Sequence, residues 1–267
     1  MRFTRTLVPI VLCLLVFALL VQAQAQNKPA QFVQITTVTV RPAAVPDYED
    51  FLKKLNAARD KTPGAQRVMT YAVNLGGPGF TYLLLTPFEK FADREKFPNG
   101  GEMLAKVYGQ AEATRLQKVQ RDSIAQQRSE VFAYQADATT NPRAFDPPSA
   151  FLQLQRNELL PEMSGDYATY SRKVKIAQEK SGDTRTIIRR NSAYGTGFVS
   201  IAITHFSKLS DRDATNPNLG EALRKAFGDA EAAQLQPIPD KSIRNRQTLF
   251  LNYRADLSHA KAGTSSN

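Results

Sequence analysis

The chain has 267 residues, one cysteine and no tryptophan, and its 35 lysines and arginines against 25 aspartates and glutamates give a net charge of +10. Because the one cysteine, Cys13, lies in the N-terminal leader, the rest of the chain can form no disulfide, thiol nucleophile or cysteine-ligated metal site. The charge is +8 without Arg2 and Arg5, and it suits either an acidic partner or a solvated basic surface. No dense run of basic residues occurs, which favours the solvated surface and argues against a nucleic-acid partner.

The N-terminal leader has the features of an export signal. Arg2 and Arg5 precede an apolar run at 7–21, and Ala23-Gln24-Ala25 matches the small-residue pattern of a cleavage site. We therefore expect a mature protein that starts near Gln26 and works in the periplasm or outside the cell. An uncleaved membrane anchor is the alternative, but the apolar run is short for a spanning helix. No later stretch is apolar enough for stable membrane insertion.

The rest of the chain carries one sequence twice. The segment 101–117 recurs at 220–236, a spacing of 119 residues, and Asp47-Tyr48 recurs with the same spacing as Asp166-Tyr167. Such self-similarity predicts two structural units in one chain. The chain then divides into a signal peptide (1–25), a first unit (31–137), a proline-rich linker (138–149), a second unit (150–257) and a disordered tail (258–267).

Each unit shows the same order of elements, strand, helix, hairpin, helix and strand. The first strand of each unit ends at a proline, and the apolar residues of the next helix recur with helical spacing. A glycine-rich turn at 77–80 and 195–198 permits the positive φ angles of a tight hairpin. In the first unit we expect a strand at 32–41, a helix at 46–61, hairpin strands at 68–75 and 80–86, a long helix from Gly101 and a strand at 130–136. In the second unit we expect a strand at 151–160, a helix at 165–180 and hairpin strands at 186–192 and 198–204. A helix from Gly220, broken at Pro237 and Pro239, and a strand at 249–255 follow.

This order is that of the ferredoxin-like β-α-β-β-α-β unit, so the fold class is α+β with two tandem units. The start of the first unit (38–56), the glycine hairpin (77–80) and its continuation (86–93) resemble the dimeric α/β-barrel superfamily, which includes antibiotic-biosynthesis monooxygenase-like and NIPSNAP-like domains. The resemblance implies two antiparallel sheets that face each other across a lumen and form a pseudo-dimeric barrel within one chain. It also allows a homo-oligomer.

Several members of that superfamily hold a ligand or a haem between the sheets, which gives an alternative to simple binding. A haem site uses a proximal histidine. The mature chain has only His205 and His259, and His259 falls in the expected tail. A polar histidine at a strand end is the commoner interpretation of His205, so no cofactor is predicted and haem stays an alternative.

The candidate binding residues come from strand alternation. If Leu83, Leu85, Ile201 and Ile203 face the helices, then Phe80, Tyr82, Phe198 and Ser200 face the lumen. If one residue is missing upstream of the second hairpin, Tyr71 and Arg189 occupy matched positions in the strands that come before these residues. Such residues either bind a ligand or fill the interface between the sheets. The candidate ligand-binding residues are Tyr71, Tyr82, Arg189, Phe198 and His205.

Arg189 is the sharpest of these candidates. In the lumen its guanidinium needs an anionic or carbonyl partner, and Glu158 on the first strand of the same unit is the internal candidate. Arg190 then points the other way.

No residue set of a metal site, nucleophilic triad or P-loop is found. The sequence therefore favours an exported protein, not an enzyme, that binds a small hydrophobic or anionic molecule between its sheets. The alternatives are a cofactor-free or haem-dependent oxygenase, and a structural or partner-binding protein with a packed lumen.

Overall fold

The computed structural model describes residues 28–195, 197–213 and 218–260. The expected signal peptide and most of the expected tail lie outside these residues. Within the described part of the chain, no helix is both long and apolar enough to cross a membrane. We call the first unit copy one and the second unit copy two.

Both copies contain a strand, a long helix, a hairpin, further helices and a last strand, in this order. Copy one contains β1 (Phe32–Val40), α2 (Val45–Asp60), β2 (Met69–Leu75), β3 (Thr81–Phe88), α3 (Phe91–Glu95), α4 (Gly100–Tyr108), α5 (Gln110–Ser123) and β4 (Ile124–Tyr134). Copy two contains β5 (Phe151–Leu159), α6 (Ser164–Ser181), β6 (Ile187–Tyr194), β7 (Val199–Phe206), α7 (Leu219–Phe227), α8 (Asp229–Leu235), α9 (Ile238–Ser242) and β8 (Ile243–Tyr253). The expected first strands, first helices and hairpins are thus present within a few residues of their expected bounds.

The eight strands form one closed antiparallel barrel in the order β1-β3-β2-β8-β5-β7-β6-β4. Within each copy the strand order is the same, β4-β1-β3-β2 in copy one and β8-β5-β7-β6 in copy two. The copies are joined where β4 pairs with β6 and β2 pairs with β8. The predicted facing sheets are therefore also hydrogen-bonded edge to edge, which leaves no open sheet edge.

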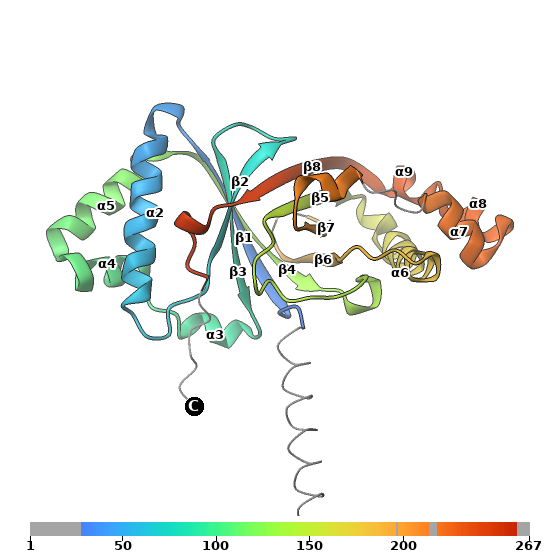
Figure 1. Ribbon diagram of the computed structural model, residues 1–267, viewed down its shortest axis with the longest axis horizontal. Coiled ribbons are helices and arrows are strands. Elements are labelled where there is room, and N and C mark those ends of the chain that lie inside the picture. The colour runs from blue at the N-terminus through green and yellow to red at the C-terminus, as the bar shows by residue number, and fades with distance from the viewer. Residues whose placement is uncertain (1–27, 196, 214–217, 261–267) are drawn as a thin grey trace, which may run out of the picture.

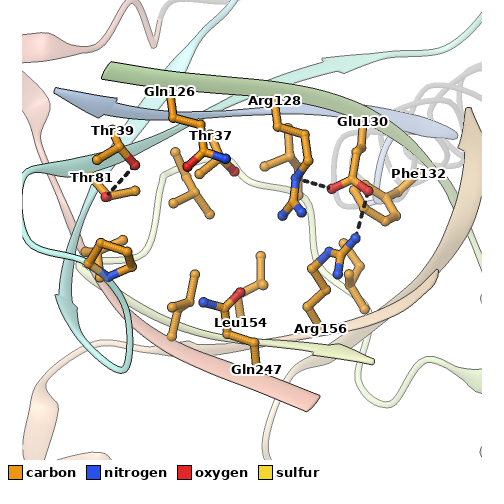
Figure 2. Close-up of a pocket in the computed structure, with 16 residues that line it drawn as sticks. Thr37, Thr39, Thr81, Gln126, Arg128, Glu130, Phe132, Leu154, Arg156 and Gln247 are labelled. Carbon is orange, nitrogen blue, oxygen red and sulfur yellow. Dashed lines mark hydrogen bonds and ion pairs between the residues drawn. The ribbon is translucent and has the colours of Figure 1, made fainter. Parts of the chain in front are cut away.

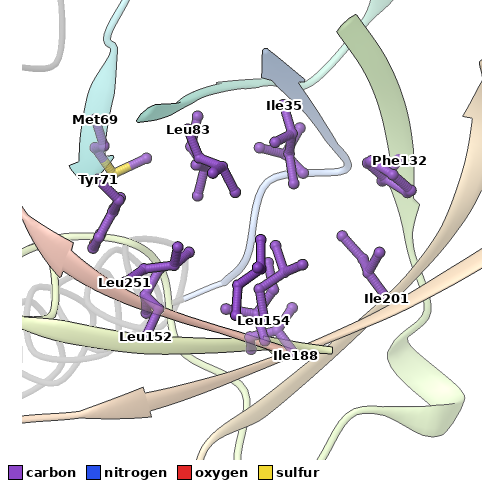
Figure 3. Packing of buried hydrophobic residues seen from close by; sticks show 14 of the residues in the cluster. Ile35, Met69, Tyr71, Leu83, Phe132, Leu152, Leu154, Ile188, Ile201 and Leu251 are labelled. Atoms are coloured by element: carbon purple, nitrogen blue, oxygen red, sulfur yellow. The ribbon is translucent and has the colours of Figure 1, made fainter. Parts of the chain in front are cut away.

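Helices cover the outside of the barrel on two opposite sides, α2, α4 and α5 on one and α6 to α9 on the other (Figure 1). Apolar side chains fill three regions, one under each helical layer and one inside the barrel. The inner cluster includes Ile35, Leu83, Leu154, Ile188 and Ile201, which pack against one another in the lumen (Figure 3). Both faces of each sheet are therefore buried, the inner face by the other sheet and the outer face by helices.

Two kinds of expected boundary were wrong, the extent of the long helices and the start of the last strands. The long helices are each broken by a glycine, Gly109 and Gly228, whose φ angles of 85° and 81° suit glycine and end the helical conformation. The last strands begin at Ile124 and Ile243, six residues before the expected 130 and 249. Most of the extra residues are polar, and several of them line one opening of the barrel.

The linker and the last described residues, 258–260, pack against the barrel at the opposite opening. The linker's Phe145 joins the inner apolar cluster, and the carbonyl of Ser149 accepts a hydrogen bond from Tyr71 Oη at 3.2 Å. His259 was expected in a disordered tail, but its backbone pairs with Val68 through hydrogen bonds of 2.8 and 2.9 Å. The residues 258–260 of the expected tail are therefore packed against the barrel, and the rest of it lies outside the described residues.

Candidate functional site

One opening of the barrel, which we call the mouth, leads into a cavity of about 200 Å³. Its inner walls are apolar, and its rim carries hydroxyls, amides and charges (Figure 2). The apolar walls are Ile35, Val73, Pro78, Leu83, Phe132, Leu154, Ile201 and Leu249. The polar lining residues are Thr37, Thr39, Thr81, Gln126, Arg128, Glu130, Arg156 and Gln247. An apolar pocket with a few convergent polar groups is the usual form of a small-molecule site.

A chain of ion pairs forms one wall of the mouth. Glu130, which is 5% exposed, lies between Arg156 Nη2 at 2.9 Å and Arg128 Nε at 3.1 Å. Arg156 also pairs with Glu158, which pairs in turn with Arg244. Figure 2 shows Arg128, Glu130 and Arg156 side by side. Three arginines and two glutamates leave an excess of one positive charge beside the cavity.

The same contacts keep this wall charged. Burial alone would lower the pKa of Arg156, but its hydrogen bonds to Glu130 and Glu158 outweigh burial and raise that pKa. The hydrogen bond from Arg156 lowers the pKa of Glu158 below its usual value. Buried arginine and carboxylate groups therefore stabilise each other as ions.

Arg128 has hydrogen-bond donors to spare that face the cavity. Its side chain is 41% exposed, its Nε is used by Glu130, and its guanidinium points into the cavity (Figure 2). Neither Nη of Arg128 hydrogen-bonds within the described residues. The lining hydroxyls of Thr39 and Thr81 bond each other at 3.0 Å on the opposite side. Arg128 can therefore donate hydrogen bonds to an anionic group in the mouth.

The opposite opening, which we call the closed end, is covered by the linker and by the first described residues. Arg190 is 0% exposed there, and its Nη2 donates to the carbonyl of Ala30 at 2.9 Å. Its guanidinium carbon lies 5.5 Å from the centre of the Tyr134 ring. His205 Nδ1 lies 2.9 Å from Ser149 Oγ, and its Nε2 is buried with no hydrogen-bond partner in the described structure.

The five candidate residues from the sequence do not form one site. Tyr71 lies in the inner apolar cluster, where its hydroxyl bonds the linker, and His205 lies at the closed end. Tyr82 was expected in the lumen, but it packs outside the barrel under α2, and its hydroxyl donates to Glu49 Oε1 at 2.7 Å. Arg189 and Phe198 come together, but at a separate cavity outside the barrel, beneath α6.

The expected faces of the hairpin strands were therefore reversed. Leu83, Leu85, Ile201 and Ile203 face the lumen, and Arg190, not Arg189, points inward with them. Glu158 accordingly pairs with Arg156 and Arg244 instead of Arg189. Of the other two residues expected inside, Phe80 is 51% exposed and Ser200 lines the separate cavity beneath α6.

The mismatch of Tyr71 with Arg189 has an identifiable cause in the repeat. Leu83 pairs with Tyr71, and its equivalent Ile201 pairs with Arg190. Tyr71 therefore corresponds to Arg190, and the missing residue lies in the second hairpin between Asn191 and Ser200, not upstream of it. A one-residue error moves a side chain to the other face of a strand.

Sequence reasoning missed the polar residues of the mouth. Gln126, Arg128 and Glu130 alternate along β4, and Arg156 follows Leu152 and Leu154 with the same period of two. This alternation was the available signal. The expected last strand starts at Glu130, so the polar residues before it lie outside that strand and their alternation was not considered.

The described residues do not suit a haem held by His205. Its ring lies beside Phe145 at the closed end, 5.2 Å between ring centres, and it does not line the cavity of the mouth. Burial and the nearby Arg143 and Arg190 lower the pKa of His205 to about 3. Among residues 28–195, 197–213 and 218–260, no three His, Cys, Asp or Glu side chains gather as metal ligands.

Comparison with known proteins identifies the fold. No protein-family model matches the sequence, and neither does any curated protein. Among solved structures, an anthrone oxidase-like protein is similar with a TM-score of 0.50 and 9% identity, over 88% of this chain and 94% of that chain. A mutant chlorite dismutase from Candidatus Nitrospira defluvii is similar with a TM-score of 0.51 and 9% identity, over 86% of this chain and 94% of that chain.

The chain therefore has the fold of the dimeric α/β-barrel proteins, with the whole barrel built from one polypeptide. The resemblance inferred from the sequence is confirmed at the level of this fold.

Proposed function

We propose that the protein binds a small amphipathic monocarboxylate in the mouth of the barrel. The observation that carries this proposal is Arg128, whose free Nη donors face a cavity with apolar inner walls. The carboxylate bonds Arg128, and the hydrocarbon part packs on Ile35, Leu83 and Ile201. The excess positive charge of the adjoining ion pairs favours an anion over a neutral molecule.

A binding role agrees better with the lining residues than a catalytic one. Glu130 is the one carboxylate among the described residues that line the cavity, and both of its oxygens pair with arginines, Oε1 with Arg156 and Oε2 with Arg128. A general base needs a free proton acceptor within reach of a substrate. The names of the two similar structures indicate that those proteins act on small molecules, which supports a small-molecule ligand here.

Calorimetric titration with straight-chain carboxylates from butyrate to octanoate tests the proposal. Each methylene buried from water contributes about 0.8 kcal/mol, so affinity is expected to rise about fourfold per added carbon until the cavity is full. An affinity that does not depend on chain length would overturn the proposal.

Variants of two arginines make the test specific. Arg128→Gln is expected to weaken hexanoate at least tenfold and to leave hexanol unchanged, because only the carboxylate uses the guanidinium. Arg246→Gln is the matched control, since Arg246 is exposed beside the lining residue Gln247 on the other face of β8. Equal losses in the two variants would show a diffuse effect of charge instead of a site.

We also propose that the barrel arose by duplication of a ferredoxin-like unit and that it acts outside the cytoplasm. The shared strand order of the two copies supports the duplication, and the leader sequence at 1–25 supports export. Cell fractionation with N-terminal sequencing tests export. A mature protein that starts near Gln26 is expected in the exported fraction, and an intact cytoplasmic chain would contradict export.

A further inference from the structure

The two copies differ in the packing between their first long helix and the sheet below it. Beneath α2 of copy one, Leu52 and Tyr82 pack together with Leu257 from the end of copy two, and all three are at most 4% exposed. In copy two the equivalent space under α6 is a cavity of about 100 Å³. This outer cavity shares no lining residue with the mouth, so it is a separate feature of the molecule.

Four replacements empty this space. Relative to the space beneath α2, the lining of the outer cavity has Ser171 for Leu52, Ser200 for Tyr82, Ala138 for Leu257 and Ala168 for Glu49. Protein interiors are normally close-packed, and an unfilled cavity destabilises the fold. The same backbone arrangement is filled in copy one, so the cavity follows from the side chains of copy two and not from the fold.

The outer cavity also contains polar atoms that lack partners. Arg189 replaces Thr70 of copy one, and its Nε is buried without a hydrogen bond in the described structure. Ser171 Oγ, on a residue 4% exposed, is likewise unpaired and lines the same cavity. A buried polar group without a partner destabilises the folded protein. Two such groups in one cavity indicate that an acceptor belongs between them.

The charge of the cavity indicates what kind of acceptor fits. Arg172 also lines the cavity, and it forms an ion pair with Asp137 at 3.4 Å. Two arginines and one aspartate leave an excess positive charge. Ala138, Leu159, Ala168 and Val199 are among the apolar side chains that line the cavity.

We propose that this outer cavity beneath α6 binds a small monocarboxylate of the size of acetate or propionate. Arg189 and Ser171 donate to the carboxylate, Arg172 adds positive charge, and the alanine walls contact the alkyl group. The volume limits the ligand to a short chain. The mouth, with a larger apolar cavity, selects a longer one.

Propionate titration of the full chain, followed by backbone amide NMR signals, tests the proposal. Saturable shifts are expected at Ser171 and Asn191, both of which line the cavity. Ala138→Leu introduces the side chain that Leu257 supplies beneath α2, so it is expected to abolish these shifts and to keep or raise the melting temperature. Arg189→Thr, the copy-one residue, is expected to weaken propionate at least tenfold.

Arg128→Gln separates this proposal from the site in the mouth. It is expected to leave the propionate shifts at Ser171 unchanged, because Arg128 does not line the outer cavity. Wild-type protein without saturable shifts at Ser171 and Asn191 would overturn the proposal, and so would unchanged propionate binding in folded Ala138→Leu. Loss of hexanoate binding alone in Arg128→Gln would concern the mouth and leave the outer cavity intact.

Discussion

Each end of the barrel buries an arginine, and the two are held in opposite ways. At the mouth, Arg156 lies between two carboxylates, and their hydrogen bonds raise its pKa despite burial. At the closed end, Arg190 has backbone carbonyls and the Tyr134 ring as neighbours, and burial lowers its pKa to about 10. It forms no ion pair with a carboxylate in the described part of the chain. The arginine at the mouth is therefore held by a network of ion pairs, and the arginine at the closed end by neutral partners.

The largest expected effect is the loss of Glu130. Glu130→Ala leaves Arg156 buried with one carboxylate, and removal of one partner from a buried ion pair costs about 3–5 kcal/mol. We expect a loss near the lower value, about 3 kcal/mol, in denaturant unfolding, because Glu158 remains. Glu158→Ala is the control with a smaller loss, since its side chain is 24% exposed and Glu130 still pairs with Arg156. Equal losses would show that the buried pair is not the stabilising contact.

Acid should destabilise the closed end through His205. Its pKa is about 3 in the folded protein and about 6.5 when unfolded, so the unfolded chain binds the proton first as pH falls. The penalty begins near pH 6.5 and grows down to about pH 3. At pH 5 it amounts to about 2 kcal/mol.

Unfolding free energies at pH 7 and pH 5 check this prediction. His205→Asn is expected to remove about 2 kcal/mol of the difference between the two pH values. Ser149→Ala keeps the histidine and should retain the difference, although it removes the hydrogen bond to Nδ1. A wild-type protein equally stable at both pH values would contradict the burial of a neutral His205.

The smallest expected effect comes from Arg190→Met. The substitution removes a donor to the carbonyl of Ala30, but it also removes a fully buried charge that has no carboxylate partner. The carbonyl of Gln31 keeps the amide of Tyr134 as donor at 2.8 Å. We expect a loss below about 1.5 kcal/mol in denaturant unfolding. A loss as large as that of Glu130→Ala would show that neutral partners stabilise the arginine as well as carboxylates do.

Much of the fold could be predicted from the repeat and from local signals. The prolines after the first strands, the helical spacing of Tyr48, Phe51 and Leu55, and the glycine hairpins indicated elements that the structure contains. The agreement of two copies strengthened each signal, because a chance pattern would not recur with the same spacing. The resemblance to the α/β barrels followed from this order and is confirmed as a fold.

The site was harder to predict, for two physical reasons. Both faces of the sheets are buried, so apolar residues such as Leu83 and Tyr82 occur on each face and alternation does not say which face is inner. The mouth breaks the rule that inward residues are apolar, since Arg128 and Glu130 point inward from a polar stretch of β4. Ion pairs between β4 and β5 depend on the closure of the barrel, which the sequence of either strand alone does not reveal.

The most direct measurement is a crystal structure of the protein with 6-bromohexanoate, in which anomalous scattering locates the bromine. The account predicts bromine in the cavity of the mouth, among Ile35, Leu83 and Ile201, with the carboxylate within hydrogen-bond distance of Arg128. Bromine on the outside of the barrel, or a mouth in which Arg128 turns away to solvent and the cavity stays without ligand, would contradict it.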